Sequence, residues 1–213
     1  TTSHLAEQWD AGGRNGLLVL PELRVEEQTG DPGALRRPGS MAALLDELLG
    51  EHLKPLFGGA RRGAADVRRL HLMSHSGGYS AVAAVLRQPD VAPRVDEVVL
   101  LDSLYGEDAT FVAWAEARAA AMASGAARLG VIYTAGGGTA EHSRAMAAKA
   151  ARWLATAPAA LHVDDRARGE LAPADYRRGA IFHRSKLSHG DTSRHYPSRF
   201  WATGGMSPRA GAR

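Results

Sequence analysis

Short apolar segments alternate along this chain with longer segments in which apolar residues recur at helical spacing. The apolar runs predict strands at 16–20, 70–76, 95–101, 129–133 and 180–183, with a short or edge strand at 160–163. Helical spacing predicts a helix ending near Asp10, helices capped by Ser40 and Asp108, and further helices after Gly78 and from Ala140 to Thr156. This alternation predicts an α/β fold, a mostly parallel sheet with helices on both faces.

Length and composition are typical of one globular domain. The 213 residues are enough to bury a sizeable core without disulfides, and we expect a single domain over 1–213 with a loose Gly, Pro and Arg-rich tail at 203–213. The absence of cysteine excludes thiol catalysis and thiolate metal sites. The net charge of +3 comes from scattered Arg interleaved with acidic residues, a pattern that argues against a nucleic-acid groove.

Targeting signals do not identify a compartment. No apolar run has the length of a membrane span, and no signal-peptide pattern stands at Thr1, so both a cytoplasmic and an exported location fit the sequence. The richness in Ala, Arg and Gly is typical of a GC-rich bacterial coding bias rather than of a particular chemistry.

A serine stands at the sharp turn between the strand that begins at Leu70 and the helix after Gly78. The turn reads Ser74-His75-Ser76-Gly77-Gly78, and the small residues two positions on either side of Ser76 allow strand and helix to approach closely. Such a turn exposes the serine Oγ, while the N–H of Gly77 points to where an acyl oxygen would become negative. A Gly-rich turn between two core elements is the alternative that these residues alone leave open.

The same five residues resemble the nucleophile elbow of the α/β-hydrolase superfamily, G-x-S-x-G. The one departure is Ser74 in place of the first glycine, a small-for-small change. The resemblance implies a three-layer α/β-hydrolase-like sandwich. It also implies a catalytic triad in the chain order serine, acid, histidine, with the acid and the histidine in turns after later strands.

Asp102 fits the acid position, because it directly follows the predicted strand 95–101. A carboxylate there would fix the tautomer of an imidazole and stabilise the imidazolium formed during catalysis. The commoner acid position in the superfamily is one strand later, but residues 134–139 contain no carboxylate and Glu141 lies in the predicted helix. A simple capping role at the strand end is the alternative for Asp102.

Three late histidines are candidates for the base. His189 follows the predicted strand 180–183 in a turn that would bring its imidazole over the elbow, whereas His183 lies inside the strand and His195 is the second choice. No spacing typical of a zinc site is present, so we expect neither a metal nor another cofactor. His75, Tyr79, Tyr105 and the polar loop at 22–39 are candidate pocket walls.

One superfamily element has no counterpart in this sequence. Members carry, upstream of the strand that matches 16–20, an earlier strand whose loop donates the second N–H of the oxyanion hole. We therefore expect the chain to be N-terminally incomplete, as the C-terminal part of a larger hydrolase or half of a two-chain enzyme. A second chain or fragment would then supply the N-terminal strands, because an exposed sheet edge favours aggregation.

The resemblance implies a serine hydrolase that acts through an acyl-enzyme. Ser76 would attack the carbonyl, His189 would transfer the proton, Asp102 would orient His189, and the Gly77 N–H would hold the oxyanion. By analogy, the substrate is a small ester, and an amide or peptide fits less well. A peptidase or an acyltransferase with the same triad stays open, as does a non-catalytic binding module of the same fold.

Overall fold

The computed structural model describes residues 4–23, 30–136 and 138–204. Its sheet has five strands: β1 Leu70–His75, β2 Val95–Leu101, β3 Arg128–Tyr133, β4 Leu161–Asp164 and β5 Ala180–Arg184. All neighbouring strands are parallel, in the order β1-β2-β3-β5-β4. The predicted α/β class with a parallel sheet is confirmed, and the short strand predicted at 160–163 is an edge strand, β4.

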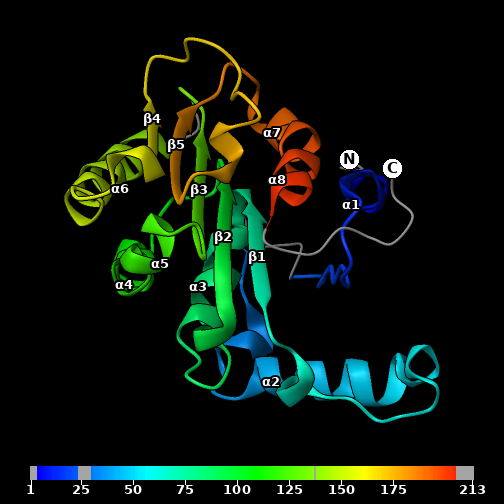
Figure 1. Cartoon of the computed structure of the whole chain (residues 1–213). Helices are drawn as coiled ribbons and strands as arrows, with labels where there is room; N and C mark the ends of the chain where they lie inside the picture. Colours follow the sequence, from blue (N-terminus) through cyan, green and yellow to red (C-terminus); the bar gives the residue numbers. More distant parts are fainter. Residues whose placement is uncertain (1–3, 24–29, 137, 205–213) are drawn as a thin grey trace.

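Helices cover both faces of this sheet (Figure 1). They are α1 Leu5–Gly12, α2 Ser40–Glu47, α3 Tyr79–Leu86, α4 Asp108–Ala117, α5 Ala119–Ala123, α6 Ala140–Trp153, α7 His189–His195 and α8 Pro197–Thr203. Figure 1 shows α3, α4 and α6 on one side of the sheet and α7 and α8 on the other. In the part of the chain that the structure describes, no helix combines the length and apolar character needed to cross a membrane.

Two hydrophobic clusters hold the three layers together. Successive residues of a strand point to opposite faces, and β2 and β3 are apolar at nearly every position, so each strand contributes to both clusters. On one face Val98 and Leu100 pack with the fully buried Phe111 of α4. On the other face Val99 and Leu101 pack with Phe200 of α8. Burial on both faces makes β2 and β3 the central strands of the core.

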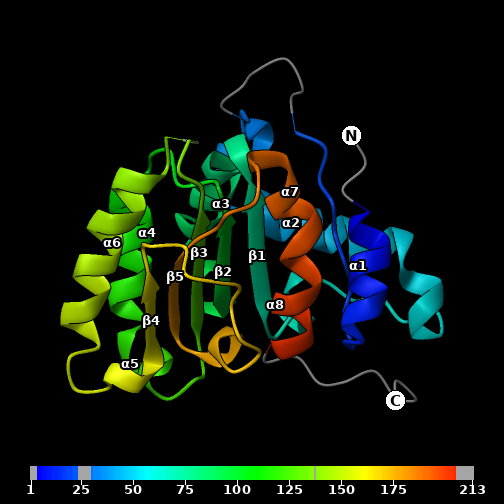
Figure 2. The same ribbon diagram turned by 90° about the horizontal axis from the view of Figure 1, so that it is seen from above.

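The predicted strand at 16–20 is wrong. These residues form no strand, and Leu17, Val19 and Leu20 are exposed. The segment continues from α1, which lies beside α8 (Figure 2). Trp9 of α1 and Trp201 of α8 make an edge-to-face contact. Strand formation needs a neighbouring strand as well as an apolar sequence, and within the described residues no strand pairs with this segment.

Three predicted helix boundaries also differ. Ser40 is the first residue of α2 rather than its cap, and its Oγ accepts a hydrogen bond from the Gln88 side chain. Asp108 likewise lies inside α4, after Glu107. The single helix predicted from Asp108 to about Ser124 is divided into α4 and α5 at Arg118, whose guanidinium donates to the backbone oxygen of Pro93. The predicted loose tail at 203–213 lies outside the described residues, apart from its first two.

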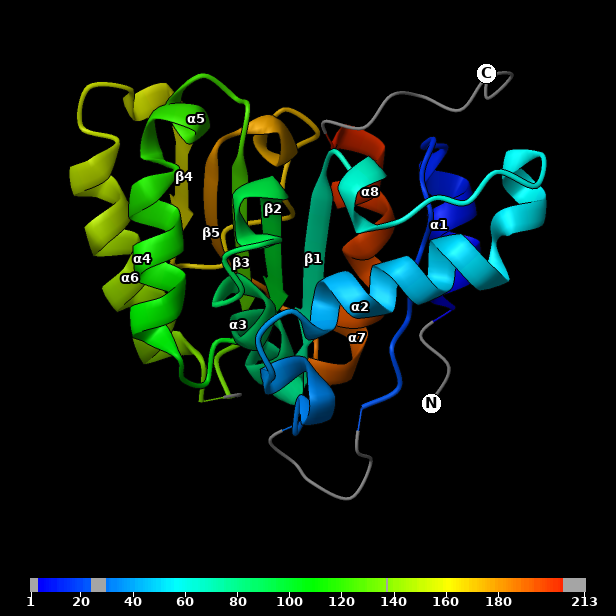
Figure 3. The same cartoon turned by 90° about the horizontal axis from the view of Figure 1, so that it is seen from below.

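The sheet leaves β1 at one edge. Its only neighbour in the described chain is β2, and most of its residues are only half-buried, in contrast to β2 and β3. Figure 3 shows β1 at the side of the sheet that lies towards α8 and α1. The turn that contains Ser76 follows β1 directly and therefore lies at this edge.

Candidate active site

The carboxyl ends of β1 and β2 bring Ser76 and Asp102 to the same level of the sheet. His75 at the end of β1 is in register with Leu101 at the end of β2, so Ser76 and Asp102 leave neighbouring strands at the same edge. Both residues have left-handed backbones, with φ of 55° and 45°. A non-glycine residue in this region costs roughly 1–2 kcal/mol, so the surrounding structure must hold each turn in place.

The turn at Ser76 is held by its neighbours. It continues through a short 3₁₀ turn, Ser76–Gly78, into α3. The hydroxyl of Ser103 donates to the carbonyl oxygen of Ser76 at 2.7 Å and lies 2.8 Å from the hydroxyl of Ser74. A Cβ on Gly78 would lie 3.2 Å from the Cβ of Ser74. The close strand-to-helix approach predicted from small residues is therefore present.

Asp102 is fully buried and is hydrogen-bonded on both carboxylate oxygens. It accepts hydrogen bonds from the hydroxyls of Thr139 and Thr134, at 2.5 and 2.7 Å, and from the Thr134 N–H at 3.1 Å. Nδ1 of His189 lies 2.8 Å from Oδ2 of the same carboxylate. Burial favours the neutral acid, but the hydrogen bonds from Thr139, His189 and Thr134 outweigh it and lower the pKa of Asp102. The carboxylate is thus kept ionised.

His189 is the histidine that meets Asp102. It is the first residue of α7 rather than part of a turn, and Ser188 caps this helix by accepting from the N–H of Asp191. With Nδ1 facing Asp102, Nε2 is the nitrogen left for a reacting group. The other two candidates lie elsewhere: His183 is buried in β5 near Asp164, and His195 lies at the far end of α7 near Glu170.

His189 is also held from the side of the elbow. Nε2 of His75 donates to the carbonyl oxygen of His189 at 2.9 Å, and the two imidazole rings are 4.5 Å apart. Burial lowers the pKa of His75, which favours its neutral form. Each of two neighbouring residue pairs therefore links His189 to the elbow. In the first, His75 contacts His189 and precedes Ser76. In the second, Asp102 contacts His189 and Ser103 binds the carbonyl oxygen of Ser76. Within the described residues the Ser76 hydroxyl makes no hydrogen bond, and such contacts often form only with substrate bound.

A glycine of the 22–39 loop lies against the elbow. The Gly30 backbone has φ +56°, its carbonyl oxygen accepts from the Ser80 hydroxyl, and a Cβ at Gly30 would lie only 2.5 Å from the carbonyl oxygen of Gly77. The sequence predicted that this loop contacts the site, which holds for Gly30, whereas residues 24–29 lie outside the described residues.

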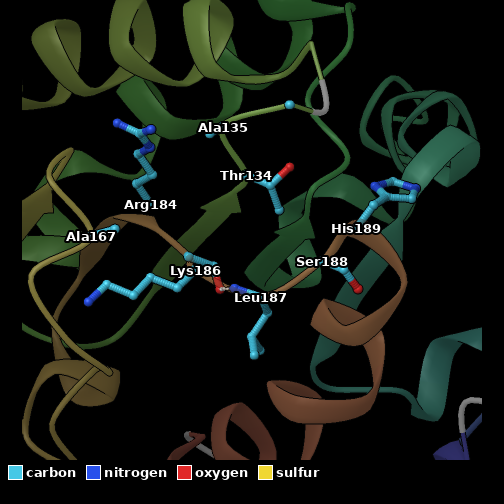
Figure 4. A pocket seen from close by; sticks show the side chains of 10 residues that line it. Thr134, Ala135, Ala167, Arg184, Lys186, Leu187, Ser188 and His189 are labelled. Atoms are coloured by element: carbon cyan, nitrogen blue, oxygen red, sulfur yellow. Dashed lines mark hydrogen bonds between the residues drawn. The ribbon is translucent and has the colours of Figure 1, made fainter.

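An open pocket of about 440 Å³ begins at His189 (Figure 4). Its walls are Thr134, Ala135, Gly136, Ala167 and the segment 184–189. None of the predicted wall residues His75, Tyr79 and Tyr105 lines this pocket. Instead, the Tyr105 ring lies 6.5 Å from the His189 ring and 6.1 Å from the Tyr79 ring, and neither tyrosine lines the pocket. The pocket is formed by the segments that follow β3, β4 and β5.

Sequence reasoning missed five residues that act at this edge. Thr134, Thr139 and Ser103 support Asp102 and the elbow, and Arg184 and Lys186 line the pocket. One signal was available, because all of these residues except Thr139 fall within three positions of the carboxyl end of a strand. Nowhere in the described chain do three or more His, Asp or Glu side chains converge to hold a metal ion.

Comparison of the chain with protein-family models, with curated proteins and with solved structures found no match.

Proposed function

We propose that this protein is a serine hydrolase of the α/β-hydrolase type that cleaves esters through an acyl-enzyme. The observation that carries the proposal is the Asp102-Ser103 dipeptide. Its carboxylate holds His189 at 2.8 Å, and the next hydroxyl holds the carbonyl oxygen of Ser76 at 2.7 Å. The residues that follow β2 thus position the other two groups of the proposed triad. Asp102, an ionised buried carboxylate, holds the imidazole, and Ser103 holds the strained turn of the serine.

The chemistry follows from these groups. Ser76 Oγ attacks the ester carbonyl carbon while Nε2 of His189 takes the hydroxyl proton, and Asp102 stabilises the imidazolium that forms. The Gly77 N–H stabilises the oxyanion. His189 then protonates the leaving alcohol, and water, deprotonated by the same imidazole, hydrolyses the acyl-enzyme. Esters are favoured over amides because an alcohol is the better leaving group.

The proposed partner is a strand from outside the described chain that pairs with the free edge of β1. Two observations support it: β1 has one neighbour in the described chain, and Leu17, Val19 and Leu20 are exposed. Light scattering and mass spectrometry of the natively isolated protein test this point. A lone chain of 22.6 kDa with full activity would contradict it.

The test of the hydrolase is labelling by a fluorophosphonate probe, which reacts only with an activated serine. We expect labelling of the wild type and its loss in Ser76→Ala and His189→Ala. Ser193→Ala and His195→Ala are matched controls at half-buried positions of α7 that do not contact Asp102, and both should label normally. A folded wild type that is not labelled, isolated with any partner attached, would refute the hydrolase and favour a non-catalytic binding module.

Substrate panels separate the remaining activities of the same triad. Hydrolysis of esters without cleavage of peptides supports an esterase, and peptide cleavage would instead indicate a peptidase. Transfer of the acyl group to an added alcohol in preference to water would indicate an acyltransferase.

A further inference from the structure

The pocket beside His189 is basic. Arg184, the last residue of β5, and Lys186 both line it, and none of its ten wall residues is Asp or Glu. Figure 4 shows His189 at one end of the pocket, with the Arg184 and Lys186 side chains towards the other end. The pocket therefore joins the proposed general base to two cations.

Neither cation forms an ion pair with a carboxylate in the described part of the chain, although the Asp165 carboxylate lies close enough to Arg184 for the two charges to attract each other. In the described part of the chain Lys186 is exposed and forms no ion pair. The Arg184 guanidinium donates at 3.3 Å to the backbone oxygen of Asp165. The Asp165 carboxylate itself is bound by Arg144, at 2.9 and 3.0 Å, and by the Tyr133 hydroxyl at 2.8 Å. Asp102 is buried and already accepts four hydrogen bonds.

We infer that the alcohol part of the substrate carries an anionic group, a carboxylate or a phosphate, that binds Arg184 and Lys186. This inference rests on the proposed hydrolase. His189 protonates the leaving oxygen, so the substituent on that oxygen lies next to His189 and extends into the pocket that His189 lines. Guanidinium and ammonium groups there recognise the negative charge.

A matched pair of esters tests the charge. 4-Acetoxybenzoate and its methyl ester share the acetyl group and differ by one negative charge on the leaving phenol, and 4-acetoxyphenyl phosphate is the phosphate counterpart. The measured quantity is the ratio of kcat/KM for the anionic ester to that for the neutral one. We expect this ratio to fall about threefold in Lys186→Met and in Arg184→Gln, and about tenfold in the double variant. Whichever anionic ester, the carboxylate or the phosphate, shows the larger fall in this ratio in the variants carries the group that the pocket prefers.

Two controls separate the pocket from other effects. Lys54→Met removes the same charge from an exposed residue in the 3₁₀ turn Lys54–Phe57, a segment that follows α2 and lies away from β5 and α7 in Figure 1. This variant should leave the ratio and the activity unchanged. Monophenyl succinate and its methyl ester place the charge on the acyl side. A ratio that responds to the variants only in this second pair would overturn the assignment to the leaving group.

Binding keeps the inference testable if turnover is absent. In Ser76→Ala, calorimetry with 4-hydroxybenzoate and its methyl ester measures recognition of the anion without chemistry. Preferential binding of the anion, lost on adding Lys186→Met and Arg184→Gln, would support the pocket even if the probe labels no serine, in which case only the hydrolase falls. Equal binding of both compounds, or a ratio that the variants do not change, would overturn the pocket.

Discussion

His71 makes the stability of this protein depend on pH. It lies on β1, away from the candidate site, with its side chain 13% exposed. Its Nε2 is 3.1 Å from an Asp96 oxygen and its Nδ1 is 2.5 Å from a Glu97 oxygen. The second Glu97 oxygen lies 2.5 Å from the Arg128 guanidinium. Burial disfavours the imidazolium, but the contacts with the Asp96 and Glu97 carboxylates outweigh it and raise the pKa of His71 from 6.5 to about 9.

The size and sign of the effect follow from this shift. Between pH 6.5 and about 9 the folded protein keeps a proton that an unfolded chain releases. The stabilisation is therefore complete below pH 6.5 and is lost as the pH rises through 9. A shift of this size corresponds to roughly 3–4 kcal/mol at most, at 1.36 kcal/mol per pKa unit. Burial lowers the pKa of His75 and His183, so their contributions change below pH 6.5, outside this window.

Urea unfolding at several pH values between 6.5 and 9 measures the effect. We expect the free energy of unfolding of the wild type to fall across this range, and that of His71→Gln to change much less, so that the two proteins converge at high pH. His52→Gln is the matched control, because His52 is 66% exposed and should keep the wild-type dependence. A wild type whose stability is flat from pH 6.5 to 9, or an identical fall in His71→Gln, would refute the reasoning.

Three further predictions concern the candidate site. Gly30→Ala should lower the free energy of unfolding by about 1–2 kcal/mol because alanine disfavours the left-handed φ at this position. The close approach of its Cβ to the Gly77 carbonyl oxygen should lower it further and should slow probe labelling. Gly33→Ala is the control, because Gly33 has φ +54° and a Cβ there would meet nothing within 4 Å. In denaturant unfolding it should lose only the part of the free energy that comes from the left-handed φ. Asp102→Asn should lower kcat on the order of 10³-fold or more, because an amide group facing Nδ1 favours the wrong tautomer, and near-wild-type kcat in a folded variant would contradict the triad. Ser103→Ala should cost roughly 1–3 kcal/mol, because the Ser76 carbonyl loses its donor, and unchanged unfolding and labelling would show that this hydrogen bond does not hold the elbow.

The sequence was sufficient to predict what depends on local pattern. Strand β2 is apolar almost throughout because it is buried on both faces, so its bounds could be read directly. Asp102 and His189 could be paired because the carboxyl ends of parallel strands meet at one edge, although Asp102 and His189 are 87 positions apart. What depends on distant contacts could not be predicted. The run at 16–20 has the pattern of a buried strand but no neighbour, and the break at Arg118 reflects a contact with Pro93.

The support of Asp102 came from residues with no local signal. Thr134 and Thr139 flank a glycine-rich turn, where hydroxyl side chains are common and usually face solvent. Both hydroxyls point to Asp102 only because β2 and β3 are adjacent, which places the turn after β3 over the end of β2. The pocket depends in the same way on β5 lying beside β3 rather than in chain order.

The burial of Asp102 favours catalysis over simple binding. Removing a carboxylate from water is costly, and here three hydrogen bonds from Thr134 and Thr139 offset that cost. The negative charge of Asp102 matters when His189 becomes positive, because the ion pair then stabilises the imidazolium that exists during proton transfer. In the proposed mechanism this happens when His189 takes a proton from Ser76, a step that a protein which only binds a ligand does not have.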